Sequence, residues 1–287
     1  MSRSYISITL SLSILAVANS GYGQDEFPIL EGPYLGQKPP GIVPEVFAPS
    51  IIQTECFEAF GVFTPDMKEF YYVAGCDAQS DKLVVFKSEN NRWSKSVLGP
   101  RAGEPSISPD GNTMHLGQRY MERTDTGWSE VKNLNAPFSE IPIMRLSASS
   151  NGTYYFDEAT GDGSGVIRYS RLIDGKREEP RPLGKNINSG KGNAHPFIAP
   201  DGSYLIWDGN REGGYGGPDL YISYRKKDGS WGAAINLGNK INTERGEAFG
   251  SVTPDGKYLF FYRGIGPGNL DIFWVDAQFI ENLRPKE

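Results

Sequence analysis

The chain has 287 residues, of which 38% are hydrophobic and 22% charged, and its formal net charge is −6. This composition excludes intrinsic disorder, and the acidic balance argues against a nucleic-acid binder with a basic face. Two His and two Cys are too few for a His-rich or Cys-rich metal site. The 35 Gly and 20 Pro favour many short strands joined by tight turns.

Residues 1–20 have the features of a signal peptide. Arg3 gives a positive start, residues 5–18 form an apolar stretch, and small residues precede a cleavage site after Ser20. Cleavage after Gly23 is the second choice, and a buried first helix is the alternative. No Cys follows the apolar stretch, and no stretch is long enough for a membrane span. We therefore expect a secreted or periplasmic protein without a lipid anchor.

The two cysteines flank a predicted hairpin. Its turn lies at residues 65–68, and cross-strand partners in a hairpin have a constant index sum. Pairing Phe63 with Phe70 gives a sum almost equal to that of Cys56 and Cys76. The two cysteines should therefore lie opposite each other and form a disulfide in an oxidising compartment. Two free buried thiols are the alternative.

The chain is repetitive. Residues 52–66 and 241–255 are identical at ten of fifteen positions. A similar turn, typically Pro-Asp-Gly, recurs five times at intervals of 44, 41, 50 and 54 residues. The Asp or Asn of these turns is Asp66, Asp110, Asn151, Asp201 or Asp255. Periods of this length, without long helical patterns, predict propeller blades rather than a helical solenoid.

Each repeat is predicted to hold four strands, with the turn between the first and the second. The last repeat lacks its fourth strand, and residues 45–50 align with the missing position. We therefore expect an all-β, five-bladed β-propeller of four-stranded antiparallel blades, with the ring closed by an N-terminal strand. Six blades are the alternative. The expected divisions are an N-terminal extended segment over 21–41, the propeller over 42–276 and a C-terminal tail over 277–287.

Residues 195–243 contain HPFIAPDGSYLIW followed by NREGGYGGPDLYISYRKKDGSWGAAINLGNKINT. This pattern resembles the WD40-like propeller repeat of the TolB type, in a small exported form. The resemblance implies the propeller fold, but the repeat serves scaffolds, sensor domains and peptidase lids alike, so it implies no particular function. The extra α/β domain of TolB has no counterpart among these residues, so no role in the Tol system is implied.

Ligands of propellers usually meet the mouth of the central channel. Residues eight and six before each turn Asp or Asn should lie there, at the start of the innermost strand. Their polar members are Glu58, Glu104, Arg145, Asn193, His195 and Glu247. Such a ring could bind a polar ligand. The alternative is that these side chains pair with the backbone of the neighbouring blade.

Other polar residues recur at positions that suit a structural role. Arg211 and Arg263 follow the second strand of their repeats, and Asp219 and Asp271 begin the third, which predicts an ion pair and a turn cap. No cofactor or metal is expected. A Ca²⁺ site at Asp208, Asn210 and Asp219 is a weaker alternative, because the segment lacks the acidic density of a calcium loop.

The residues favour a non-catalytic binding or scaffold protein. A Gly-x-Ser-x-Gly elbow is missing from the sequence, and two His leave little choice of catalytic base. We expect a monomer that recognises a protein or peptide, or alternatively a glycan, at the channel face. The enzyme alternative is a glycoside hydrolase or related channel-site hydrolase that uses Glu58, Glu104 and Glu247.

Overall fold

The computed structural model describes residues 29–76 and 80–286. These residues are almost entirely in strands and turns, and α1 (Gln278–Leu283) is the α-helix of the described part. The prediction of an all-β chain is therefore confirmed. The predicted signal peptide, residues 1–20, lies outside the described residues. Within the described ranges, no helix has the length and apolar character required to cross a membrane.

The strands form successive antiparallel groups, and each group contains one of the recurring turns. The first group is β3 (Phe57–Phe63), β4 (Glu69–Gly75), β5 (Lys82–Glu89) and β6 (Arg92–Pro100), and the second is β7 (Pro105–Ile107), β8 (Thr113–Leu116), β9 (Arg119–Thr124), β10 (Gly127–Trp128) and β11 (Lys132–Asn133). The third is β12 (Leu146–Ala148), β13 (Tyr154–Glu158), β14 (Val166–Ser170) and β17 (Arg181–Pro182), with the small hairpin of β15 (Leu172–Ile173) and β16 (Lys176–Arg177) inserted. The fourth is β18 (Lys191–Ile198), β19 (Tyr204–Asn210), β20 (Asp219–Tyr224) and β21 (Ile235–Asn236), and the fifth is β22 (Glu247–Val252), β23 (Tyr258–Gly266) and β24 (Asn269–Asp276).

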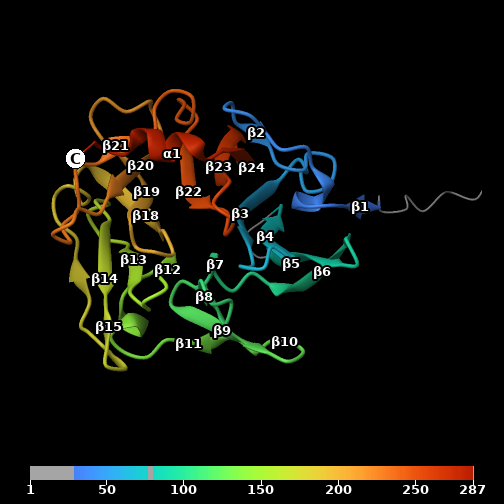
Figure 1. Cartoon of the computed structure of the whole chain (residues 1–287), viewed down its shortest axis with the longest axis horizontal. Helices are drawn as coiled ribbons and strands as arrows, with labels where there is room; N and C mark the ends of the chain where they lie inside the picture. Colours follow the sequence, from blue (N-terminus) through green and yellow to red (C-terminus); the bar gives the residue numbers. More distant parts are fainter. Residues whose placement is uncertain (1–28, 77–79, 287) are drawn as a thin grey trace, which may run out of the picture.

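The groups surround a common centre. In Figure 1 the first strand of each group, β3, β7, β12, β18 or β22, lies nearest to that centre. Contacts run from β3 to β7, β12, β18 and β22 in turn, and β23 and β24 of the last group contact β3 of the first. β3 also pairs in parallel with β24 at Phe57 and Leu270. The two ends of the repeat array are therefore in direct contact.

The N-terminal segment holds these two ends together. β2 (Glu45–Val46) pairs antiparallel with β24, which is the position that the alignment of residues 45–50 predicts. Phe47 is 1% exposed and packs against Phe70 of the first group and Trp274 of the last. β1 (Leu30–Glu31) pairs with the outer edge of β6. Buried aromatic surface of this kind is a major source of stability, so the segment fastens the last group to the first.

The recurring turns share one hydrogen-bond pattern. A side-chain oxygen of the Asp or Asn accepts a bond from the backbone N–H two residues later in each case, at Lys68, Asn112, Thr153, Ser203 and Lys257. The next residue is left-handed, with φ of +59° at Met67, +74° at Gly111, +77° at Gly152, +74° at Gly202 and +75° at Gly256. Glycine recurs at this position because it takes this conformation without steric cost.

Substitution of a turn glycine by alanine measures the free-energy cost of the left-handed backbone conformation for a residue with a side chain. A Cβ added at Gly256 meets no atom within 4 Å, so Gly256→Ala adds strain only from its positive φ. We expect the unfolding free energy to fall by about 1 kcal/mol in urea titrations. Gly184 has equal space and no positive φ, so Gly184→Ala is the control and should raise stability by about 0.5 kcal/mol. Equal effects would contradict this interpretation of the turns.

The first hairpin places the cysteines opposite each other. Phe63 pairs with Phe70, a bulge follows, and Phe57 then pairs with Gly75. The bulge changes the index sum by one, which accounts for the small difference between the two sums. Cys56 and Cys76 are bonded, with Cα atoms 4.8 Å apart and a sequence separation of 20 residues.

Loss of this disulfide should weaken the first group of strands. Closing a loop of this length restricts the unfolded chain and contributes about 3 kcal/mol. We expect the Cys56→Ala/Cys76→Ala double variant to lose about that amount in chemical denaturation. Wild type measured with a reductant should match the variant. An unchanged midpoint in both would contradict the prediction.

Candidate functional site

Three of the innermost strands carry a bulge at the same repeat position. The register shifts in β3, β18 and β22, and the residue at the bulge is left-handed: Phe60 has φ of +63°, His195 of +50° and Phe249 of +60°. Such a conformation is unusual for a residue with a side chain, and a bulge leaves backbone groups outside the ladder. These groups need other partners, because the strands are buried.

At two of these three bulges, a buried carboxylate from the second strand of the preceding group is the partner. Asp157 of β13 accepts the backbone N–H of His195 in the next group at 2.9 Å. Asp208 of β19 accepts the backbone N–H of Phe249 in the group after that, at 3.0 Å. Both carboxylates are at most 2% exposed. Each therefore fixes the bulge of the following group, which is a structural role that the sequence analysis did not assign to either residue.

His195 lies between carboxylates. Its Nδ1 is 2.9 Å from Asp208 Oδ1, and its Nε2 is 3.4 Å from Glu104 Oε2. Burial disfavours the imidazolium, but the neighbouring carboxylates outweigh burial and raise the pKa of His195 to about 10. Burial also raises the pKa of Glu104, with Asp157 adding to the effect against the opposing charge of His195. Glu104 Oε2 has no hydrogen-bond partner among the described residues.

The other two predicted acids stabilise loops. Glu58 accepts bonds from the backbone N–H and hydroxyl of Thr54, and Glu247 accepts the same pair from Thr243. Arg263 also donates to Glu247, at 2.6 Å. Glu58 and Glu247 are at most 1% exposed. Neither shares a described hydrogen-bond or ion-pair partner with Glu104, so the three carboxylates are not joined in one described network.

The remaining predicted residues make local contacts. Asn193 is 2% exposed and donates to the backbone carbonyl of Ser164. Arg211 donates to the carbonyl of Ile187, Asp219 accepts from Asn236 and the backbone of Tyr215, and Asp271 accepts from Gln53. Among the described ion pairs, Arg263 pairs with Glu247, and none joins Arg263 to Asp271 or Arg211 to Asp219.

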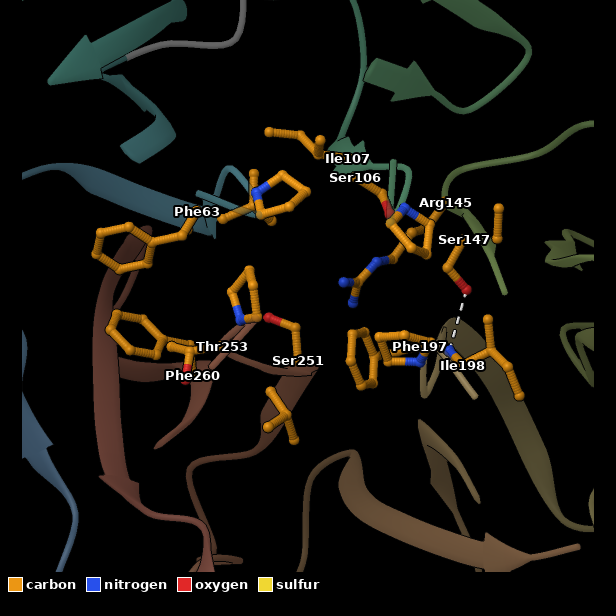
Figure 2. A pocket seen from close by; sticks show the side chains of 18 of the residues that line it. Phe63, Ser106, Ile107, Arg145, Ser147, Phe197, Ile198, Ser251, Thr253 and Phe260 are labelled. Carbon is orange, nitrogen blue, oxygen red and sulfur yellow. Dashed lines mark hydrogen bonds between the residues drawn. The ribbon is translucent and has the colours of Figure 1, made fainter. Parts of the chain in front are cut away.

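A cavity of about 240 Å³ lies at the other end of the innermost strands, beside the recurring turns. All the groups contribute equivalent residues to its wall. The residue before each turn Asp or Asn lines it, namely Pro65, Pro109, Ser150, Pro200 and Pro254. So does the residue four before, namely Val62, Ser106, Ser147, Phe197 and Ser251. Figure 2 shows these walls converging around an open centre.

Arg145 is the charged residue of the cavity lining. It is 1% exposed, and Figure 2 shows its guanidinium directed into the centre of the cavity. Burial lowers the pKa of Arg145 to about 10, with nearby carboxylates opposing the effect, so the side chain is cationic at neutral pH. Of the six predicted ligand residues, it is the one that lines this cavity.

The position of the cavity differs from the expected channel mouth. The sequence placed the mouth at the start of the innermost strands, whereas the cavity is lined by their ends and by the turns. Two other pockets, of about 350 Å³ and 320 Å³, lie elsewhere among the described residues, and the second of them includes Glu104 and Arg101. A binding role for the other five predicted residues stays a prediction. The signal for the cavity lies in the repeat itself, since small or apolar residues recur at the wall positions.

The described ranges hold no cluster of three or more His, Cys, Asp or Glu residues arranged to bind a metal ion. Asp208 is bonded to His195 and to the backbone of Phe249, and Asp219 to Asn236. The two carboxylates of the considered Ca²⁺ site therefore already have protein donors.

Comparison with known proteins identifies the fold. No protein-family model and no curated protein sequence matches the chain. Among solved structures, the catalytic domain of a GH62 α-L-arabinofuranosidase from Coprinopsis cinerea is 11% identical, with 86% of this chain and 96% of that chain covered and a TM-score of 0.53. The fold belongs to the β-propeller class. At this identity the likeness concerns the fold alone.

Two further structures have lower scores. A gluconolactonase from Xanthomonas campestris is 8% identical, with 86% of this chain and 96% of that chain covered and a TM-score of 0.49. TolB from Acinetobacter baumannii is 17% identical, with 75% of this chain covered and a TM-score of 0.46. The match spans 53% of that TolB chain. The TolB type of the repeat remains an expectation from the sequence.

The charge of His195 predicts how stability depends on pH. Its pKa of about 10 in the folded chain lies above the ordinary value of 6.5, so its stabilising effect is complete below pH 6.5 and is lost as pH rises through 10. We expect the unfolding free energy of wild type to fall between pH 7 and pH 9.5, and His195→Gln to flatten this slope.

His115→Gln is the control for that measurement. Burial lowers the pKa of His115 to about 4, so this residue is neutral throughout the alkaline range and its loss should leave the slope unchanged. An equal slope in wild type and His195→Gln would contradict the assigned charge of His195.

Proposed function

We propose that this protein is an exported, monomeric, five-bladed β-propeller that binds a protein or peptide partner at the turn face of its channel without catalysing a reaction. The five recurring turns, the four-strand order of the groups and the addition of β2 to β24 support five blades. The signal-like residues 1–20 support export to the periplasm or the medium.

The cavity beside the turns carries the proposal. Its walls are mostly Pro, Phe, Ile and Val side chains, and a single buried cation lies among them. Binding sites typically combine such apolar walls with a few placed polar groups. The turns that form the rim are ordered by their own side-chain hydrogen bonds, so the site needs little rearrangement to receive a ligand.

The buried acids support a role without catalysis. Glu58 and Glu247 are held by threonine residues, and the pKa of His195 keeps this imidazole protonated at neutral pH, so it cannot serve as a general base. Glu104 supports the second candidate, a channel-site hydrolase, because its pKa is raised and its Oε2 accepts no described hydrogen bond, with His195 Nε2 3.4 Å away. That carboxyl would have to act with another acid, and the candidates Asp157 and Asp208 are already bonded to backbone N–H groups.

The test blocks the cavity and measures peptide selection. The hydroxyl of Ser251 lines the cavity and forms no described hydrogen bond, so Ser251→Phe should fill the space while keeping the strands intact. We expect a random peptide library to be enriched on wild type and not on this variant. Ser94→Phe on the exposed face of β6 is the matched control and should retain enrichment.

Two outcomes would contradict the proposal. Equal enrichment on wild type and Ser251→Phe would put the binding surface elsewhere. Hydrolysis of an aryl-glycoside or polysaccharide panel, abolished by Glu104→Gln with an unchanged melting temperature, would favour the hydrolase.

A further inference from the structure

We infer that the turn-face cavity accepts a carboxylate at the end of an apolar chain, with Arg145 as the anion-binding residue. This inference deepens the proposed function and rests on it. It names the chemical group that enters the cavity and the direction in which a peptide would enter, with the C-terminus first.

The guanidinium of Arg145 has unused donors. Its Nη1 donates to the carbonyls of His195 at 3.4 Å and Gly250 at 3.2 Å. Nε has no hydrogen-bond partner among the described residues, and no described bond uses Nη2. The ring of Phe249 covers one face, with its centroid 3.6 Å from the guanidinium carbon. The arginine is thus held in place. Nε is itself buried, so Nη2 is the donor that is left for an anionic oxygen in the cavity.

The nearby acids do not serve as direct counter-ions. No ion pair within 4 Å joins Arg145 to a carboxylate in the described part of the chain. Asp157 accepts three backbone N–H groups, Asp208 is bonded to His195, and Glu104 lies near Arg101 and His195. From beyond ion-pair distance, the negative charges of these acids still reduce the free-energy cost of burying the Arg145 cation. A direct partner is still missing, and an unpaired buried charge favours an anionic ligand.

The walls define the rest of the ligand. Phe63, Ile107, Phe197, Ile198 and Phe260 line the space, with the hydroxyls of Ser106 and Ser251 beside them. Neither hydroxyl takes part in a described hydrogen bond, so both can donate to a second carboxylate oxygen. An inorganic anion would leave the apolar walls in contact with water. A carboxylate on an apolar residue would instead contact both the Arg145 cation and the apolar walls.

The volume of the cavity suits the end of a peptide better than a larger ligand. Sites for whole drug-sized ligands occupy roughly 300–1,000 Å³, and this cavity of about 240 Å³ is smaller. One or two terminal residues of a peptide fit this size better than a folded surface. A free carboxylic acid with a short apolar chain presents the same chemistry.

The test changes the ligand and leaves the protein intact. We would titrate wild type with pentapeptides Gly-Ser-Gly-X-X, where X is Leu, Ile, Val or Phe, each as the free acid and as the C-terminal amide. The free acids should bind about tenfold or more tightly than their amides, since a charge-assisted pair is lost. Octanoate and octanamide, measured alongside, distinguish a free acid from a peptide.

Variants of Arg145 test whether this residue causes the preference for the free acid over the amide. Arg145→Lys should keep part of the preference for the acid, and Arg145→Gln should abolish it. Arg211→Gln is the matched control, because Arg211 also stacks on an aromatic ring and donates to a carbonyl but does not line the cavity. If Arg145→Gln fails to fold, the comparison of acid with amide on wild type still decides the question.

The outcomes separate the two proposals. Equal binding of acid and amide peptides, lost in Ser251→Phe, would overturn the carboxylate inference and support the binding function. Binding of octanoate without any peptide would support the carboxylate and overturn the protein partner. No binding of any probe would overturn both.

Discussion

The backbone N–H groups at the bulges of the innermost strands must find partners away from water, and the centre of the molecule is organised around that requirement. Asp157 and Asp208 satisfy it for the fourth and fifth groups of strands, each from the preceding group. An unsatisfied buried N–H costs about 1–3 kcal/mol, and an unbonded buried carboxylate costs more. Neighbouring groups are therefore held in one relative position, and their first strands face the channel with little freedom.

This arrangement determines which buried cation is left without an ion-pair partner in the protein. The carboxylates that fix the bulges surround His195 and raise its pKa, so the imidazole is a cation paired within the protein. Arg145 has backbone carbonyl partners and a ring face, and its guanidinium is directed into the cavity beside the turns. One end of the channel is thus occupied by internal ion pairs, and the other end keeps a cation with unused donors between apolar walls. The proposed binding role rests on that contrast.

Much of the fold could be predicted because the turns repeat. The Asp or Asn bonds and the left-handed glycines follow from residue chemistry, and the pairing of residues 45–46 with the last strand follows from the alignment of the repeats. The bulges could not be predicted, because Phe60 and His195 adopt a conformation that their residue types disfavour. A bulge changes which side chains of a strand face inward. Five of the six predicted mouth residues consequently make internal contacts away from the cavity, and Arg145 alone of the six lines it.

The most direct test is a crystal structure of the wild-type protein with a pentapeptide ending in Leu-Leu as the free acid. The terminal carboxylate is predicted to lie about 3 Å from the guanidinium of Arg145, with the last side chain against the apolar wall. A peptide bound outside the cavity, or one that enters it with its N-terminus or through its middle, would contradict the account.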